Sequence, residues 1–254
     1  MDSRIGIGTH WIHTTYNYNE WYAAPRAGRE CPPEISQAVE YVSQAHIGDH
    51  PFFKYAAGSS DALGVWVAQE AIITGPFAQL LASLAARIQN VHVRAMVMKV
   101  ANGEHGPLRH NVAYQSHPWL LDQLRQSVGL SPHDIHILPE TRAFLEVMFA
   151  NCDASEMRAI GTLGMGSELL LIEEYGAVRR AFQTAWPSAQ FQRFLDANIN
   201  EDQEHSKLMI GAAQMMATLG DEPAEFLRGT RESVDARITY YSHLLETVTS
   251  GAHS

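Results

Sequence analysis

The sequence predicts an all-α protein, a bundle of seven or eight helices. Apolar residues recur with the helical period of about 3.6 residues along most of the chain beyond the first 33 residues. No segment of useful length alternates as a β-strand does, and no strand–helix–strand unit or internal repeat occurs. The 254 residues suffice for one large domain, and no stretch has the composition of a linker. We therefore expect an irregular arm over residues 1–33 and a single helical domain over residues 34–254.

Turn and capping residues divide this domain into its expected helices. Ser60 or Asp61 can cap a long apolar helix over 59–88. Gly75 and Pro76 kink or divide that helix, because proline removes one helical hydrogen bond. The other helices are expected over residues 32–46, 90–106, 116–129, 139–152, 154–182, 188–220 and 223–248.

The composition excludes several classes of partner. The formal net charge of −10 argues against nucleic acid or an anionic membrane as a partner. No apolar run reaches the roughly 20 residues that span a bilayer, and the N-terminus lacks the apolar core of a secretory signal. Two cysteines are too few for a disulfide framework, so we expect a cytoplasmic protein. Thirteen histidines are many for this length, which directs attention to metal chemistry.

A polar stripe runs along the helix expected over 188–220. Asn198, Asp202 and His205 occupy positions i, i+4 and i+7 on one face. Glu201 adjoins them, and no lysine or arginine interrupts the stripe, as one would on an ordinary solvated face. The stripe is therefore a candidate ligand surface, directed at the interior of the bundle.

Other helices carry acidic or imidazole side chains at positions where apolar residues are expected. Glu70 and Glu168 lie within apolar runs. Glu104 lies near the end of its helix, and His117 begins the next one. Carboxylates and imidazoles from facing helices are the ligands of non-haem iron or manganese, with positions left open for dioxygen. The ferritin-type pattern, which needs Glu-x-x-His twice, is absent.

Each of these residues also has a purely structural interpretation. Glu104 can be a surface residue at the end of its helix, and Asp202 with His205 can form a hydrogen bond on the helix surface. Because clusters of titratable groups mark function in only some proteins, spacing alone leaves a metal site and a structural polar cluster equally open. The residues expected to be simply exposed are Glu173, Glu174, His105 and His110.

Three segments of the chain resemble a known superfamily. They are HPFFKYAAGSSDALGVWVAQEA, RAMVMKVANGEHG and SHPWLLDQLRQSVGL. Together they are similar to the heme-oxygenase-like superfamily, which contains diiron oxidases and oxygenases, the metal-free pyrroloquinoline quinone synthase and thiaminase-type enzymes. The resemblance covers roughly residues 46–210 and implies a heme-oxygenase-like bundle.

The resemblance to the diiron branch implies a set of metal ligands. Glu104 and His117 match a glutamate and the histidine that opens the next helix, and Glu168 matches a second glutamate in mid-helix. The last family motif, His-x-x-x-Asp-x-x-His, is matched by Asp202 and His205, whereas its first histidine is Asn198 here. The implied cofactor is Fe(II), one or two ions, with dioxygen as co-substrate.

The exchange of histidine for Asn198 leaves one ligand position open. An asparagine amide oxygen binds such a metal only weakly, so the second metal position is expected to be the weaker one. Glu201 or Glu70 can fill the gap; some relatives carry a carboxylate at the position of Glu70. We therefore treat Glu70 and Asn198 as candidate catalytic residues beside the five candidate ligands.

The resemblance implies an O2-activating non-haem iron oxygenase or oxidase that acts on a small molecule. N-oxygenation of an amine in specialised metabolism is the first expectation, and oxidative C–C or C–H cleavage of an amino acid or fatty acid is the second. We also expect a homodimer and an external electron donor. The same resemblance allows a metal-free cofactor-biosynthesis or thiaminase-type enzyme, or a non-catalytic binding protein. A thiaminase-type enzyme needs a nucleophile such as Cys152, and a quinone synthase needs a basic pocket, for which the chain offers mainly Arg94, Arg158, Arg179 and Arg180.

The substrate pocket is expected between the segments 66–77 and 156–170. Gly161, Gly164 and Gly166 lie on the second of these segments. They allow either close helix packing or room for a substrate beside Glu168, and the sequence leaves both open.

Overall fold

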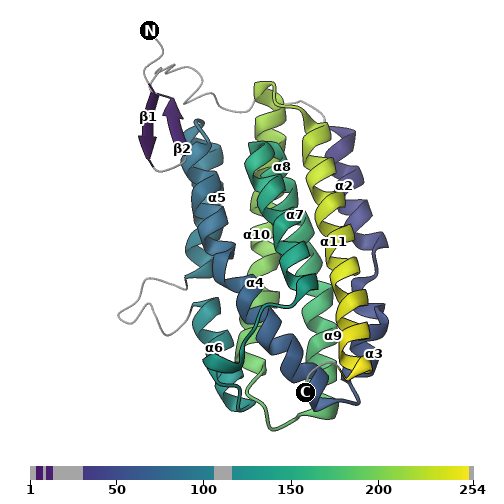
Figure 1. Cartoon of the computed structure of the whole chain (residues 1–254). Coiled ribbons are helices and arrows are strands. Elements are labelled where there is room, and N and C mark those ends of the chain that lie inside the picture. Colours follow the sequence, from purple (N-terminus) through teal and green to yellow (C-terminus); the bar gives the residue numbers. More distant parts are fainter. Residues whose placement is uncertain (1–3, 8–9, 14–30, 106–115, 252–254) are drawn as a thin grey trace.

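The structure is a computed structural model of the whole chain, and it describes residues 4–7, 10–13, 31–105 and 116–251. It is an all-α bundle, as the sequence predicts (Figure 1). If the contiguous segments α8, η4 and α9 are counted as one helix, the described residues form eight helices of eleven residues or more. The α-helices are α2 (Pro33–Gln44), α3 (Pro51–Ala56), α4 (Ser60–Arg87), α5 (Val91–Glu104), α6 (His117–Ser127), α7 (Pro139–Ala154), α8 (Glu156–Ile160), α9 (Leu170–Ala185), α10 (Gln192–Leu219) and α11 (Pro223–Ser250).

The helix α4 runs without a break through Pro76. Of the two expectations at Gly75-Pro76, a kink or a division, the division is therefore wrong. The N-cap is Ser59, not Ser60 or Asp61, and its hydroxyl accepts a bond from Ala62 N at 3.1 Å. Buried residues cover most of the circumference of α4, and one side of the helix is exposed, with Asp61, Gly75, Gln79, Ala82 and Ala86. A helix with so broad an apolar face packs against several neighbours in a bundle, and these hold it in place.

The segment expected as one helix over 154–182 is continuous but not uniform. Its centre is a π-helix, η4 (Gly161–Leu169), between α8 and α9. π-helical turns are rare and often occur at functional sites, because the extra residue per turn changes the direction of the side chains. Glu168 lies on this segment.

Part of the N-terminal arm is regular. Strand β1 (Arg4–Ile7) pairs with β2 (His10–His13) in an antiparallel hairpin, with Ile5 opposite Ile12. This hairpin corrects the expectation of an irregular segment at these positions, where eight residues in two short strands leave little alternation to detect. The rest of the arm, residues 1–3, 8–9 and 14–30, lies outside the described residues.

Aromatic side chains fill the core beside the site. Trp66 of α4 lies edge-on to Tyr175 and to Phe182 of α9, with ring centroids 6.0 and 6.1 Å apart. Tyr175 also contacts Phe194 of α10, at 5.5 Å. These contacts fix α4, α9 and α10 relative to one another around the polar interior. Among the described residues, no helix has the length and apolar character needed to cross a membrane.

Candidate metal centre

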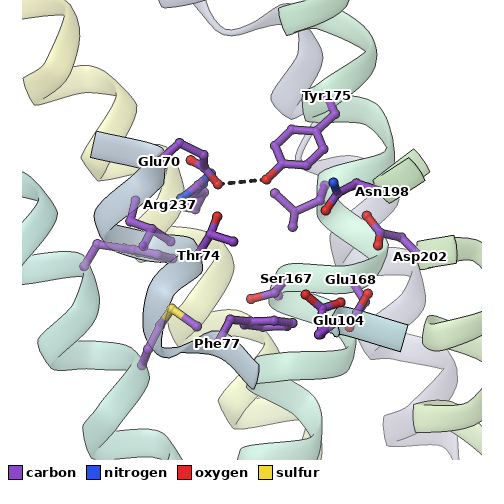
Figure 2. A pocket seen from close by; sticks show the side chains of 15 residues that line it. Glu70, Thr74, Phe77, Glu104, Ser167, Glu168, Tyr175, Asn198, Asp202 and Arg237 are labelled. Atoms are coloured by element: carbon purple, nitrogen blue, oxygen red, sulfur yellow. Dashed lines mark hydrogen bonds and ion pairs between the residues drawn. The ribbon is translucent and has the colours of Figure 1, made fainter. Parts of the chain in front are cut away.

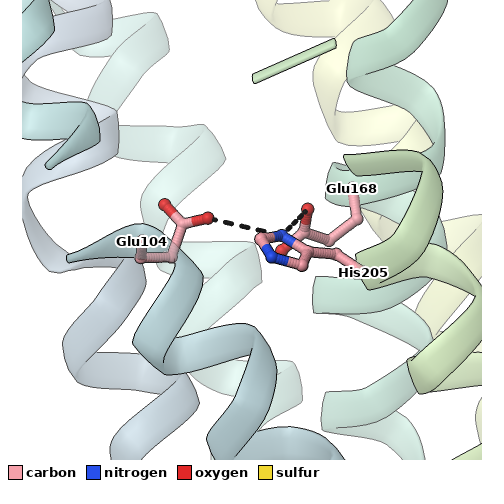
Figure 3. Close-up of side chains that lie close together, drawn as sticks. All are labelled: Glu104, Glu168 and His205. Atoms are coloured by element: carbon pink, nitrogen blue, oxygen red, sulfur yellow. Dashed lines mark hydrogen bonds and ion pairs between the residues drawn. The ribbon is translucent and has the colours of Figure 1, made fainter. Parts of the chain in front are cut away.

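Three of the five predicted ligands converge in the interior of the bundle (Figure 3). Glu104 of α5, Glu168 of η4 and His205 of α10 each offer one ligand atom, and these atoms lie within 4.8 Å of one another. His205 Nδ1 lies 3.2 Å from Glu168 Oε2 and 3.7 Å from Glu104 Oε1. Three helices distant in sequence thus direct acidic and imidazole groups to one point.

His117 joins this group through Glu104. The Ser116 hydroxyl caps α6 by accepting a bond from Trp119 N, which places His117 in the first turn. His117 Nδ1 lies 3.0 Å from Glu104 Oε2, and the ring is buried. The two oxygens of Glu104 therefore face two different histidines.

Asp202 and Asn198 lie beside the three converging residues, one and two turns along α10. Asp202 is buried, and its Oδ2 and the Oε1 of Glu168 have no hydrogen-bond partner among the described residues. Asn198 donates from Nδ2 to the carbonyl of Phe194 at 2.7 Å. Its amide nitrogen is thus occupied, and the amide oxygen is its remaining polar atom.

The charges of this cluster do not balance. Burial raises the pKa of Asp202 well above its usual range, and the charge of Glu168 adds to the effect. Burial also raises the pKa of Glu168, although the bond to His205 opposes it. Burial alone would lower the pKa of His117, but the adjacent Glu104 and Glu201 raise it to about 10. Buried carboxylates that outnumber their cationic partners need protons or a metal ion.

The donor set fits a divalent metal. Carboxylate oxygens and imidazole nitrogens together suit iron and manganese. Two buried carboxylate oxygens, Glu168 Oε1 and Asp202 Oδ2, have no hydrogen-bond partner among the described residues, and a bound cation would relieve this condition. Iron binding stays a prediction for all five residues.

A glycine makes room for His205. A Cβ atom added at Gly103 of α5 would lie 2.3 Å from His205 Nε2. No real side chain tolerates that distance, so the imidazole can rest against α5 only because position 103 carries no Cβ. Gly103 immediately precedes Glu104. The two helices that carry Glu104 and His205, α5 and α10, therefore approach closely beside the cluster.

A cavity opens beside the cluster (Figure 2). Its walls include α4 and the η4 segment, the two segments predicted from the sequence, together with residues of α5, α7, α9, α10 and α11. The cavity volume is about 30 Å³, enough for about two water molecules at roughly 10–15 Å³ each. The residues that line it are Glu70, Ile73, Thr74, Phe77, Glu104, Phe144, Met148, Gly166, Ser167, Glu168, Leu171, Tyr175, Asn198, Asp202 and Arg237.

The opposite wall of the cavity holds a second polar cluster. Arg237 of α11 binds Glu174 through both Nε, at 3.0 Å, and Nη2, at 2.5 Å. Its Nη2 also binds Glu70 Oε2 at 2.8 Å, and Tyr175 donates to Glu70 Oε1 at 2.8 Å. Both oxygens of Glu70 are thus engaged, and the structure does not bring Glu70 to the metal cluster.

This second cluster corrects one expectation and adds one residue. Glu174 is fully buried, not part of a solvated face, because α9 turns this side toward Arg237. Glu173 is exposed as expected, and its carboxylate accepts a bond from Gly48 N. Arg237 was not predicted from the sequence; the available signal was a lone arginine between Val234 and the apolar stretch that follows it.

The glycines of η4 serve helix packing. A Cβ at Gly161 would lie 2.1 Å from the carbonyl oxygen of Phe226, and one at Gly164 would lie 2.4 Å from Met209 Cβ. One at Gly166 would lie 2.4 Å from Ser233 Cβ. The packing interpretation is therefore correct for all three, although Gly166 also borders the cavity.

Residues required by the metal-free alternatives lie elsewhere. Cys152 is buried outside the cavity, and burial raises the pKa of its thiol to about 12, which leaves it protonated and unreactive. None of the four candidate arginines lines the cavity; Arg158 pairs with Glu225 and Arg179 with Asp196. His105 is exposed as expected, and His110 lies outside the described residues.

The fold and this cluster define a helical-bundle protein with a candidate iron site. Residues 65–238 match the sequence model of a family described as iron-containing redox enzymes, of the haem-oxygenase-like group. Because the match spans well over half of the chain, the protein belongs to this family. No curated protein matches the chain in sequence.

Solved structures share the fold, among them the two that follow. A CADD-like protein of unknown function from Nostoc punctiforme is 17% identical, with a TM-score of 0.68 over 84% of this chain and 98% of that one. A TenA homolog from Pseudomonas syringae pv. tomato is 14% identical, with a TM-score of 0.66 over 85% of this chain and 94% of that one. At this identity the similarity establishes the fold alone.

Proposed function

We propose that the protein is a non-haem iron oxygenase that uses dioxygen to oxidise a small molecule, first of all an amine. The observation that carries the proposal is the buried cluster of Glu104, Glu168 and His205 beside a cavity. His117 and Asp202 complete the ligand set for one or two ferrous ions. Bound iron supplies the redox chemistry that activates dioxygen, which no amino-acid side chain in the cavity can supply.

The protein's own residues would keep water out and orient the substrate. Thr74 and Phe77 of α4 lie between the two polar clusters (Figure 2), and Phe144 is a further apolar residue of the cavity lining. As it stands the cavity is small, so a substrate larger than a few atoms has to displace part of this wall. Exclusion of water strengthens every electrostatic interaction inside.

An amine is the substrate that the family resemblance suggests first. The Arg237 guanidinium is bidentate on Glu174 and also binds Glu70. Tyr175 engages the other oxygen of Glu70, and burial raises the pKa of this carboxyl, so the far wall of the cavity is occupied by contacts within the protein. N-oxygenation of an amine to a hydroxylamine consumes O2, two electrons and two protons and releases water, so an external electron donor is required.

The proposal is tested by metal analysis followed by oxygen uptake. Anaerobic loading with Fe(II) is expected to leave one to two equivalents bound, and oxygen uptake is then followed with alkylamines, fatty acids and an electron donor. Glu168→Ala and His205→Ala should abolish uptake while the helical circular dichroism remains. Protein that retains no iron would refute the proposal, and iron retained without any uptake would favour a non-catalytic binding protein.

A further inference from the structure

His117 needs a partner on each side of its ring. A neutral imidazole carries one N–H, and its other nitrogen offers a lone pair. Nδ1 of His117 faces Glu104 and so faces the candidate metal cluster. If Nδ1 gives its lone pair to a metal, the proton must be on Nε2, which is buried and has no aligned hydrogen-bond acceptor among the described residues.

Glu201 is the acidic side chain positioned to accept the hydrogen bond that this N–H of His117 donates. Its Oε2 lies 3.4 Å from His117 Nε2, on the side of the ring away from Glu104. Glu201 belongs to α10 and His117 to α6, so the contact joins two helices that carry candidate ligands. Histidines that bind metals almost always donate their other N–H to a carboxylate, a carbonyl or water, which fixes the tautomer and the ring orientation.

The position of Glu201 does not suit the alternative role of replacement ligand. Asn198 and Asp202 border the cavity beside the cluster, whereas Glu201 does not. The Glu201 side chain is 39% exposed, while the side chains of Glu104 and Glu168 are at most 5% exposed. Glu201 therefore lies on the Nε2 side of His117, closer to the surface than the candidate ligands and outside the cavity that Asn198 lines.

We propose that Glu201 is a positioning residue that holds His117 with its proton on Nε2 and its Nδ1 directed at the metal. The inference rests on the proposed function, since it presumes that the cluster binds a metal. In this role Glu201 acts on the metal only by orienting His117. It does not replace the histidine that is missing at position 198.

The test compares metal affinity and the imidazole proton in matched variants of the full-length protein. Glu201→Ala should weaken binding of Fe(II) by about 10–100-fold, as the loss of such a partner typically does. Glu201→Gln keeps an acceptor oxygen and should recover part of that loss. Glu204→Ala is the control, because Glu204 lies on the same helix, is exposed and pairs with Lys207.

The spectroscopic readout uses the protein loaded with Zn(II), which is diamagnetic. An imidazole N–H proton resonance that disappears in His117→Gln should be present in the parent protein and in Glu204→Ala. It should shift or broaden in Glu201→Ala. Equal affinity and an unchanged resonance in Glu201→Ala would overturn the proposal.

Two further results would separate this inference from the proposed function. If Glu201 were a ligand instead, Glu201→Ala would lower the number of bound metal equivalents and Glu201→Gln would not recover them. That result overturns the positioning role and leaves the iron oxygenase intact. A parent protein that binds neither Fe(II) nor Zn(II) would overturn both.

Discussion

The two ends of the cavity both bury carboxylates but treat them differently. At one end Arg237 binds Glu174 through two nitrogens and Glu70 through one, and Tyr175 and Tyr241 donate further hydrogen bonds to the carboxylates. At the other end Glu168 and Asp202 each keep an oxygen without a partner among the described residues. The carboxylates of the first cluster find their hydrogen-bond and charge partners within the protein. Those of the second cluster need a proton or a metal ion in addition.

This difference separates a structural cluster from a binding site. Breaking a buried ion pair is costly because it leaves a charge unpaired. Buried carboxylates that outnumber the cations around them already bear part of such a cost, and a bound metal ion would offset it. The comparison therefore predicts opposite effects of charge removal at the two ends.

The largest effect is expected at Arg237. Arg237→Met leaves Glu70 and Glu174 buried without their cation and should reduce the free energy of unfolding by about 3–5 kcal/mol. Chemical denaturation measures this loss. Arg228→Met, on the same helix but exposed, should leave the unfolding midpoint nearly unchanged.

A second variant keeps the Arg237 prediction testable if Arg237→Met does not fold. Adding Glu70→Gln and Glu174→Gln removes the stranded charges, so the triple variant should regain stability. An Arg237→Met protein as stable as the parent would show that the two ends do not differ as described.

Charge removal at the metal end should act in the opposite direction. Burial raises the pKa of Asp202, so the folded state binds more protons than the unfolded state above pH 3.8, and the ionised carboxylate costs stability as the pH rises through this range. Asp202→Asn should therefore leave the metal-free protein at neutral pH as stable as the parent, or more stable. Iron retention should fall by about tenfold or more. Thermal unfolding of metal-free protein and iron analysis measure the two effects; a clear loss of stability would assign Asp202 a structural role.

A smaller effect is expected where the helices approach most closely. Gly103→Ala places a methyl group 2.3 Å from His205 Nε2, so the ring must move away from Glu104 and Glu168. Metal affinity should fall by about tenfold, the loss typical of a disturbed ligand. Gly211→Ala is the control, because its added methyl would be 3.5 Å from the nearest atom, Met96 Sδ, an ordinary contact. Equal metal affinities in the two variants would contradict the close approach.

The smallest effect is expected at Asn198. Asn198→His restores an imidazole, a better ligand than an amide oxygen, and should tighten the weaker metal position. It also removes the bond to the Phe194 carbonyl, at a cost of about 1 kcal/mol. In an iron titration, the two metal positions should have unequal affinities in the parent protein and more nearly equal affinities in Asn198→His. Two indistinguishable tight positions in the parent protein would contradict the prediction.

Both clusters contain buried carboxylates, but the sequence predicted only the cluster near His205 and not the one around Arg237. Asn198, Asp202 and His205 lie on one helix face, so their spacing alone placed them together. Glu174 is also on a helix, but its only local context is Glu173, and adjacent glutamates usually indicate a solvated face. The partner that buries Glu174 is Arg237, 63 residues later in the chain. No local pattern connects the two.

The sequence by itself determined the all-α class, the helix order and the helix faces that carry the candidate ligands, because helical periodicity and caps act over a few residues. The tertiary structure decided which of those faces meet. It brought Glu104, Glu168 and His205 to one point, paired Glu70 with Arg237 and placed Glu201 next to Nε2 of His117. It also made the η4 glycines packing residues. These outcomes depend on the packing of helices that are far apart in the chain, which short-range spacing does not encode.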